Sequence, residues 1–159
     1  MNRTLQKGIA TLAMGVLLLG CASDPVVTPA SGVEIAKDPS IALFYDRATG
    51  FYRALSNRRV NSFMTYQDEF LRAAFRDHGQ FSDYYAQLAE SLREDRFERN
   101  QPLFVEVEEF FIEGPGRARA RVHFRGDNSF PLRWWTVSHV REDHWEREGD
   151  EWWIVPGKL

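Results

Sequence analysis

The clearest pattern in the sequence is the run Leu103-Phe104-Val105-Glu106-Val107-Glu108, in which apolar and acidic residues alternate. A second alternating run, Ala118-Arg119-Ala120-Arg121-Val122-His123-Phe124-Arg125, follows the turn residues Glu113-Gly114-Pro115-Gly116. Because successive side chains on a β-strand point to opposite faces of a sheet, this period of two predicts two strands, each with one buried face. The two runs and the glycines between them therefore predict an antiparallel hairpin.

The charges predict the register of this hairpin. A four-residue loop would place Ile112 opposite Arg117. From that pairing the buried side carries Val107 opposite Val122 and Val105 opposite Phe124, and the exposed side carries Glu108 opposite Arg121 and Glu106 opposite His123. In this register the two exposed glutamates each face a basic residue across the hairpin.

The C-terminal part of the chain predicts a second hairpin. A strand from Leu132 to about Arg141, continuing to Arg147, is followed by the turn Glu148-Gly149-Asp150-Glu151 and by Trp152-Trp153-Ile154-Val155. Glycine in the first position of a two-residue loop favours a turn whose twist matches that of the strands. This pairing places Trp145 opposite Ile154 and Arg147 opposite Trp152.

The first half of the chain has helical spacing instead. A helix is expected to begin at Asp38-Pro39, because aspartate caps free amide groups and proline fits the first helical position. Its apolar stripe is Ile41, Phe44, Tyr45, Ala48, Phe51, Tyr52 and Leu55. A second helical region, in one or two pieces, is expected to end at His78-Gly79, and Ser82 is expected to cap a third helix. The apolar residues of these two regions are Val60, Phe63, Met64, Phe70, Leu71, Ala74 and Phe75, then Tyr84, Tyr85, Leu88 and Leu92.

About three helices followed by four antiparallel strands predict an α+β fold over residues 38–159, with the helices packed on one face of a curved sheet. The order of these elements, the early Phe51-Tyr52-Arg53-Ala54-Leu55 and the closing hairpin 147–154 resemble the NTF2-like superfamily. The resemblance implies a cone-shaped domain in which a bent sheet curls around a helix. No aspartate and tyrosine fall at positions that match the catalytic residues of its isomerase and dehydratase members.

The N-terminus predicts a secretory signal. Arg3 and Lys7 precede an apolar run from Ile9 to Leu19, which is too short to span a bilayer. The sequence Leu18-Leu19-Gly20-Cys21 resembles the lipobox of bacterial lipoproteins. The resemblance implies cleavage before Cys21, acylation of that cysteine and anchoring of the chain to a membrane through the lipid. Ala22 in the next position implies the outer membrane, with the domain facing the periplasm.

The predicted organisation is thus a signal peptide at 1–20, a lipidated flexible linker at 21–37 rich in proline and serine, and one domain at 38–159. Removing the signal leaves 18 Lys+Arg against 23 Asp+Glu, a balance of −5. A mildly acidic chain is a poor partner for nucleic acid. Cys21 is the single cysteine, so no disulfide is expected, and stability has to come from the aromatic core.

Glu109 is the candidate for chemistry. In the simple hairpin register it lies on the buried face opposite Ala120, where a carboxyl group could act as a general base. The alternative is a β-bulge at Glu108-Glu109, which turns Glu109 outward and brings Phe110 and Ile112 into the core. We favour the bulge, because an unpaired buried carboxylate is costly.

Two groups of residues are candidates for a binding surface. Arg119 and Arg121, with Arg117 and Arg125, could bind phosphates of lipid headgroups, but the glutamates across the hairpin favour a solvated face of mixed charge. Trp134-Trp135 and Trp152-Trp153 are expected to have one member facing the core and one facing outward. The outward members either form a partner, ligand or glycan surface or cover another element.

No spacing for a metal site or a cofactor motif was found, and His78, His123, His139 and His144 are scattered. Two classes of function remain. The first is a membrane-anchored, non-catalytic envelope module that binds a protein or a small apolar ligand, including as a subunit of an assembly. The second is a small enzyme of the isomerase or dehydratase type. Converging titratable groups in a cavity would favour the enzyme, and an apolar lining would favour binding.

Overall fold

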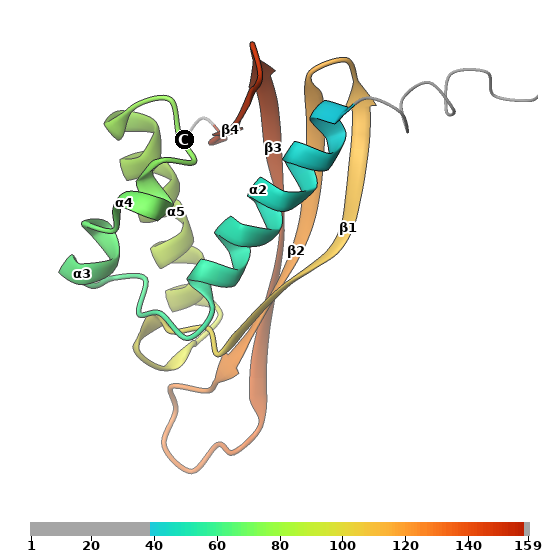
Figure 1. The fold of residues 1–159 in the computed structure, drawn as a ribbon. Coiled ribbons are helices and arrows are strands. Elements are labelled where there is room, and N and C mark those ends of the chain that lie inside the picture. The colour runs from blue at the N-terminus through green and yellow to red at the C-terminus, as the bar shows by residue number, and fades with distance from the viewer. Residues whose placement is uncertain (1–38, 158–159) are drawn as a thin grey trace, which may run out of the picture.

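The computed structural model describes residues 39–157 as an α+β domain, with the helices before the strands in chain order (Figure 1). The helices are α2 (Pro39–Leu55), α3 (Phe63–Tyr66), α4 (Glu69–Arg72), α5 (His78–Glu94) and the short 3-10 helix η1 (Glu98–Asn100). The strands are β1 (Phe104–Gly114), β2 (Arg117–Asp127), β3 (Thr136–Glu148) and β4 (Glu151–Val155). The predicted signal, Cys21 and the linker lie outside the described residues. Within 39–157, no helix combines the length and the apolarity needed to cross a bilayer.

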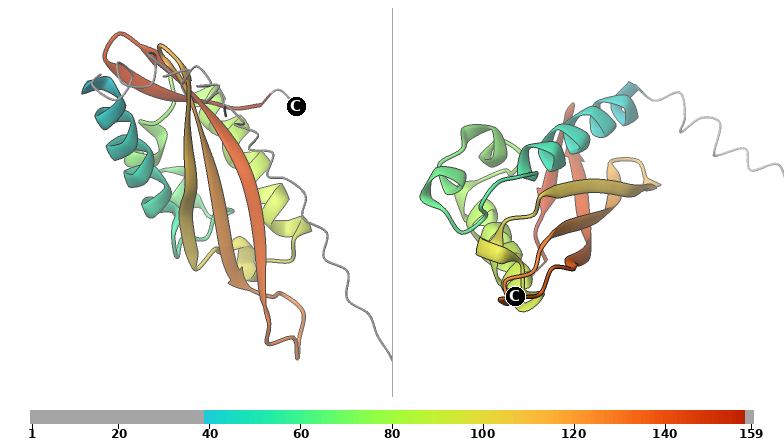
Figure 2. Two further views of the ribbon diagram at one scale, coloured as in Figure 1. Left: turned by 90° about the vertical axis from the view of Figure 1, so that its right-hand side faces the viewer. Right: turned by 90° about the horizontal axis from the view of Figure 1, so that it is seen from below.

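The four strands form one antiparallel sheet in the order β1-β2-β3-β4, a simple meander. The helices lie on one face of this twisted sheet, and no element of residues 39–157 covers the other face of β1, β2 and β3 (Figure 2). Alternate residues of β2, from Ala118 to Phe124, are buried against the helices, as the period of two predicted. The predicted four-stranded antiparallel sheet is therefore confirmed.

The predicted stripe on α2 is largely confirmed. Phe44, Ala48, Phe51, Tyr52 and Leu55 are buried, whereas Ile41 is half-buried and Tyr45 is exposed. Within the core, the ring of Phe44 lies 5.0 Å from Trp152, 5.3 Å from Phe110 and 5.7 Å from Trp145, measured between ring centroids. The centre of the domain is thus built from aromatic rings contributed by α2, β1, β3 and β4.

The second helical region is in two pieces, which was one of the predicted possibilities, but its apolar residues are less buried than predicted. It consists of two four-residue helices, capped by Ser62 and Asp68, whose side chains accept hydrogen bonds from backbone amides. Because such short helices present no continuous apolar stripe, three predicted stripe residues are exposed: Phe63, Met64 and Phe70.

The expected helix end at His78-Gly79 is wrong, because α5 begins there. Asp77 is the cap, and its carboxylate accepts a hydrogen bond of 2.8 Å from the amide of Gln80. Ser82, the predicted cap, lies inside the helix, where its hydroxyl donates to the carbonyl of His78. A strong aspartate cap thus takes precedence over glycine as a stop signal.

The hairpin register is confirmed up to Val107 and shifts beyond it. The predicted pairs of Val105 with Phe124, Glu106 with His123 and Val107 with Val122 are present. A bulge then moves the register by one residue, so the predicted pairs of Glu108 with Arg121 and Ile112 with Arg117 are wrong. In their place the structure pairs Glu109 with Arg121 and Ile112 with Ala118, and a second irregularity after Ile112 pairs Gly114 with Arg117.

The closing hairpin has the predicted pairs, Trp145 with Ile154 and Arg147 with Trp152. Strand β3, however, begins at Thr136 and not at Leu132. Leu132 has a φ of 65°, which is incompatible with extended backbone, and belongs to the loop between β2 and β3.

Candidate functional site

A carboxylate lies in the middle of the aromatic core. Asp143 is on β3, opposite Ala120 of β2, and only 3% of its surface is exposed. The alternation of β3 turns Asp143 to the same face as Trp145, which is fully buried. The small side chain of Ala120 leaves room beside it for polar groups that come from the helices.

Three side chains donate hydrogen bonds to Asp143. The hydroxyls of Tyr52 from α2 and Tyr84 from α5 donate to Oδ2 over 2.9 and 2.8 Å. The guanidinium of Arg141 on β3 donates from Nε to Oδ1 over 2.7 Å. The indole of Trp145 in turn donates to the Tyr52 hydroxyl over 3.1 Å. These five residues are called the Asp143 cluster below.

The electrostatics of the cluster follow from its burial. Burial, together with the negative charge of Asp143, raises the pKa of Tyr52 and Tyr84 well above its usual value. Burial by itself would lower the pKa of Arg141, but the nearby Tyr84 and Asp143 outweigh it and raise that pKa. The guanidinium also lies 4.5 Å from the centroid of the Tyr84 ring. At neutral pH both hydroxyls of the cluster are therefore neutral and the guanidinium is charged.

This cluster is closed to ligands. Tyr52, Tyr84 and Asp143 are each 3% exposed or less, and both oxygens of the carboxylate already accept hydrogen bonds. A hollow of about 480 Å³ between α2 and β1 touches Tyr52, but the hydroxyl of that residue points to Asp143 instead. The arrangement can hold helices to a sheet, and within the described residues the carboxylate is buried away from any open space.

An open groove lies elsewhere, between α2, the segment from α4 to Ala74 and the turn between β3 and β4. Its volume is about 630 Å³. Phe51 and Trp152 line it as buried residues, and Leu43 and Phe70 line it with half or more of their surface exposed. The full lining is Leu43, Asp46, Arg47, Phe51, Phe70, Ala73, Ala74, Asp150, Glu151 and Trp152, which we call the aromatic groove.

Charges among these lining residues are unequal. Asp46, Asp150 and Glu151 carry three carboxylates, against the single guanidinium of Arg47. Arg47 is already engaged, since it donates to the carbonyl of Ala73 and lies 4.8 Å from the centroid of the Trp153 ring. The groove is therefore apolar with an acidic surround.

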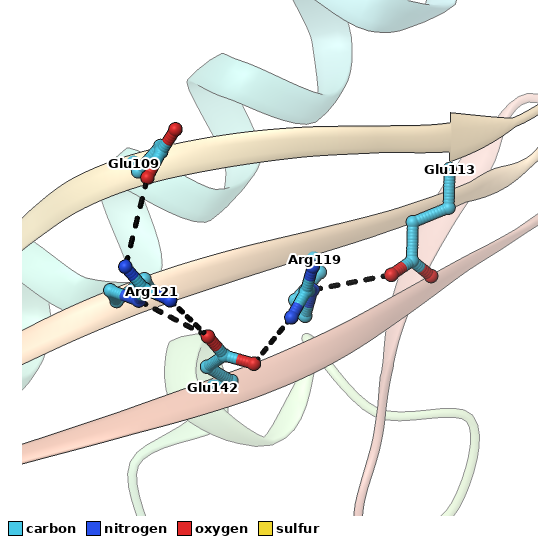
Figure 3. Close-up of polar contacts among 5 residues, drawn as sticks. All are labelled: Glu109, Glu113, Arg119, Arg121 and Glu142. Atoms are coloured by element: carbon cyan, nitrogen blue, oxygen red, sulfur yellow. Dashed lines mark hydrogen bonds and ion pairs between the residues drawn. The ribbon is translucent and has the colours of Figure 1, made fainter.

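Glu109 has the geometry of the bulge. Its side chain is 54% exposed on the outer face of the sheet, where a carboxylate oxygen lies 3.8 Å from a guanidinium nitrogen of Arg121 (Figure 3). The burial on which the general-base hypothesis depended is absent. Phe110 and Ile112 pack against the core, as the bulge predicted.

Arg119 and Arg121 lie in the same outer face, between carboxylates (Figure 3). Arg121 binds Glu142 through two nitrogens, over 3.1 and 2.8 Å. Arg119 also donates to Glu142 and lies 3.2 Å from an oxygen of Glu113. Hydrogen bonds from both arginines lower the pKa of Glu142. The outer face has the mixed charge that the sequence favoured.

The two tryptophan pairs have different surroundings. Trp152 is buried, and its indole donates to the carbonyl of Ser40 over 2.8 Å, while Trp153 is half-buried beneath Arg47. Trp134 and Trp135 lie outside the strands and are 91% and 53% exposed, so the expectation that one of this pair faces the core is wrong.

The Asp143 cluster was not predicted from the sequence. The alternation of Arg141, Asp143 and Trp145 at every second position was the available signal, because it places a charge pair on the same face as a core tryptophan. The partners on the helices are 91 and 59 residues away along the chain, so no local pattern identifies them.

The raised pKa values predict a specific alkaline behaviour. The pKa of a tyrosine in the unfolded chain is about 10. A tyrosine whose pKa is higher in the folded chain stabilises the fold fully when the pH is below about 10. This stabilisation is lost as the pH rises from about 10 through the pKa of the folded chain. The free energy of unfolding should therefore fall above about pH 10. Tyr84→Phe should cost about 1.5–3 kcal/mol at neutral pH, the usual contribution of a hydrogen bond to a charged group, and should depend less on alkaline pH.

Urea unfolding at several pH values would measure both effects. Tyr45→Phe is the matched control, because Tyr45 is 38% exposed and lies outside the cluster, and its effect should stay within about 0.5 kcal/mol. Equal stability and equal alkaline dependence of the two variants would contradict the described role of Tyr84.

Comparison of the chain with protein-family models, with curated proteins and with solved structures found no match. The function is therefore argued from the residues themselves. Two features of the described domain carry that argument: a sealed polar cluster in the core and an open apolar groove beside α2.

Proposed function

We propose that this chain is a lipid-anchored lipoprotein of the cell envelope whose domain binds a small apolar ligand in the aromatic groove without catalysis. The anchor is Cys21, on the basis of the lipobox resemblance of Leu18-Leu19-Gly20-Cys21. Ala22 supports the outer membrane, with the domain facing the periplasm. The lipid would hold the domain at the membrane essentially permanently, since two or three acyl chains bury many methylenes.

We also propose that the domain is a divergent NTF2-like fold. The order of helices and strands, the bent antiparallel sheet with helices on one face and the closing hairpin support this proposal (Figure 1). The superfamily includes enzymes, so the fold by itself does not separate catalysis from binding.

The observation that carries the non-catalytic proposal is the separation of the acid from the open space. Asp143 and its two tyrosines are the kind of groups from which an isomerase site is built, yet they are sealed, fully hydrogen-bonded and neutralised by Arg141. The aromatic groove, which a ligand can enter, is lined mainly by apolar side chains. An apolar lining is the condition that favours binding.

The groove also indicates the chemistry of its ligand. A volume of about 630 Å³ is within the range of small-molecule sites. An apolar ligand would cover the exposed ring of Phe70 and the exposed side chain of Leu43. Three carboxylates against one engaged guanidinium disfavour an anionic group, so the ligand should end in a neutral or cationic group.

This proposal predicts the behaviour of a neutral apolar probe. N-phenyl-1-naphthylamine should gain fluorescence on binding to the domain, and the anionic probe 1-anilinonaphthalene-8-sulfonate should bind more weakly. Phe70→Asp should weaken binding of the neutral probe about tenfold or more, because it places a charge in the apolar lining.

Phe63→Asp is the matched control. Phe63 is 75% exposed, compared with 59% for Phe70, and it lies on α3 outside the groove. The Phe63→Asp variant should bind the neutral probe as tightly as the unmodified domain does. Equal loss of binding in both variants, or stronger binding of the anionic probe, would contradict the proposed site.

The anchor has its own test. Cells that produce the full chain should incorporate labelled palmitate into it, and Cys21→Ala should abolish the label. An unlabelled chain, or a labelled Cys21→Ala variant, would contradict lipidation at Cys21.

A further inference from the structure

The loop between β2 and β3 exposes the largest apolar side chains of the described domain. Residues 128–135, which we call the tryptophan loop, read Asn128-Ser129-Phe130-Pro131-Leu132-Arg133-Trp134-Trp135. Leu132 is 99% exposed, Trp134 91%, Trp135 53% and Phe130 37%. The loop projects beyond the end of the sheet (bottom of Figure 1). A cluster of exposed apolar side chains of this kind marks an interaction site.

The shape of this loop is held in place by hydrogen bonds at its base. The amide of Ser129 donates to the carbonyl of Arg96 over 2.7 Å, and that of Phe130 donates to the side chain of Asn128 over 2.9 Å. The amide of Arg133 donates to the carbonyl of Phe130 over 3.2 Å. The positive φ of Leu132 makes the turn that places this residue in solvent.

Two guanidinium groups surround the ring at the base of the loop. Those of Arg96 and Arg133 lie 4.8 and 4.6 Å from the centroid of the Phe130 ring, and that of Arg133 lies 5.2 Å from Trp135. The loop thus combines an apolar tip with cationic groups set behind it. Asp127 is the nearest acidic residue along the chain, at the end of β2.

From this arrangement we propose that the tryptophan loop inserts into the interface of a phospholipid bilayer. Tryptophan concentrates at membrane–water interfaces because its ring is apolar and its N–H group is polar. Leu132 and Trp134 would enter the acyl boundary, while the guanidinium groups of Arg96 and Arg133 would meet lipid phosphates. A projecting tip suits a deformable bilayer, whereas a protein partner would need a pocket shaped to receive it.

The position of the loop is compatible with an anchor at Cys21, and this one argument depends on the proposed function. The loop and the start of α2 lie at opposite ends of the sheet (Figure 1). The 13 residues of β3 span about 44 Å, and the 18 residues from Cys21 to Asp38 reach at most about 60 Å when extended. Lipid and loop can therefore occupy the same membrane, where tethering makes even a weak loop affinity effective.

Vesicle binding by the chain from Ala22 onward tests this proposal without the lipid. That chain contains every element of the described core, and it should sediment with vesicles of phosphatidylethanolamine and phosphatidylglycerol. The double variant Leu132→Ala/Trp134→Ala should bind the vesicles at least about tenfold more weakly than the unmodified chain. Because the contact is mainly apolar, raising the salt concentration should leave most of the binding intact.

The matched control is Phe63→Ala/Met64→Ala, which removes two side chains that are 75% and 79% exposed on α3. It should bind vesicles as the unmodified chain does. Lipids brominated in the acyl chains should quench tryptophan fluorescence on binding. Trp134→Phe/Trp135→Phe should lose most of that quenching, because Trp145 and Trp152 are buried and Trp153 is half-buried beneath Arg47.

Three outcomes would overturn the proposal: no vesicle binding by the unmodified chain, equal binding by the loop variant, or capture of a protein through the loop without any affinity for vesicles. Because these experiments use chain without lipid, they do not depend on acylation. A chain that takes up palmitate but has no loop-dependent vesicle affinity would contradict the loop proposal alone.

Discussion

A carboxylate inside an aromatic core is stable only when its charge and its lone pairs are satisfied, and Asp143 places this constraint on the whole domain. The groups that satisfy it come from α2, α5 and β3, in the form of Tyr52, Tyr84 and Arg141. The helices and the sheet must therefore meet at one fixed distance and rotation. The surrounding rings, Phe44, Phe51 and Trp145 among them, complete the seal against water.

This constraint also shapes the functional account. The acid and the tyrosines are used to join the layers, so their chemistry is internal to the fold. Two apolar surfaces of the described domain are open to other molecules, the aromatic groove beside α2 and the tryptophan loop at the far end of the sheet. The proposed binding function uses these two apolar surfaces and leaves the buried acid, Asp143, to the fold.

Much of the fold could be predicted from the sequence, because the period of two in β1 and β2 and the helical stripe on α2 are local patterns. The bulge could be predicted as well, because the regular register would have placed the carboxylate of Glu109 in the core without a partner. The start of α5 could not be predicted in this way, because Asp77 caps that helix just before Gly79, and the glycine suggested a helix end. Exposure of Phe63 and Phe70 depends on two short helices that periodicity over a longer window does not resolve. The Asp143 cluster could not be predicted either, because its tyrosines lie 91 and 59 residues from Asp143 along the chain.

The most direct test of the central claim is a double-mutant cycle between Asp143 and Arg141, with urea unfolding of Asp143→Asn, Arg141→Met and the double variant. If the buried charges depend on each other, each single variant leaves one of them unpaired, and the double variant removes both. The double variant should then be at least about 1 kcal/mol more stable than the sum of the single effects predicts. Additivity within about 0.5 kcal/mol would contradict the account.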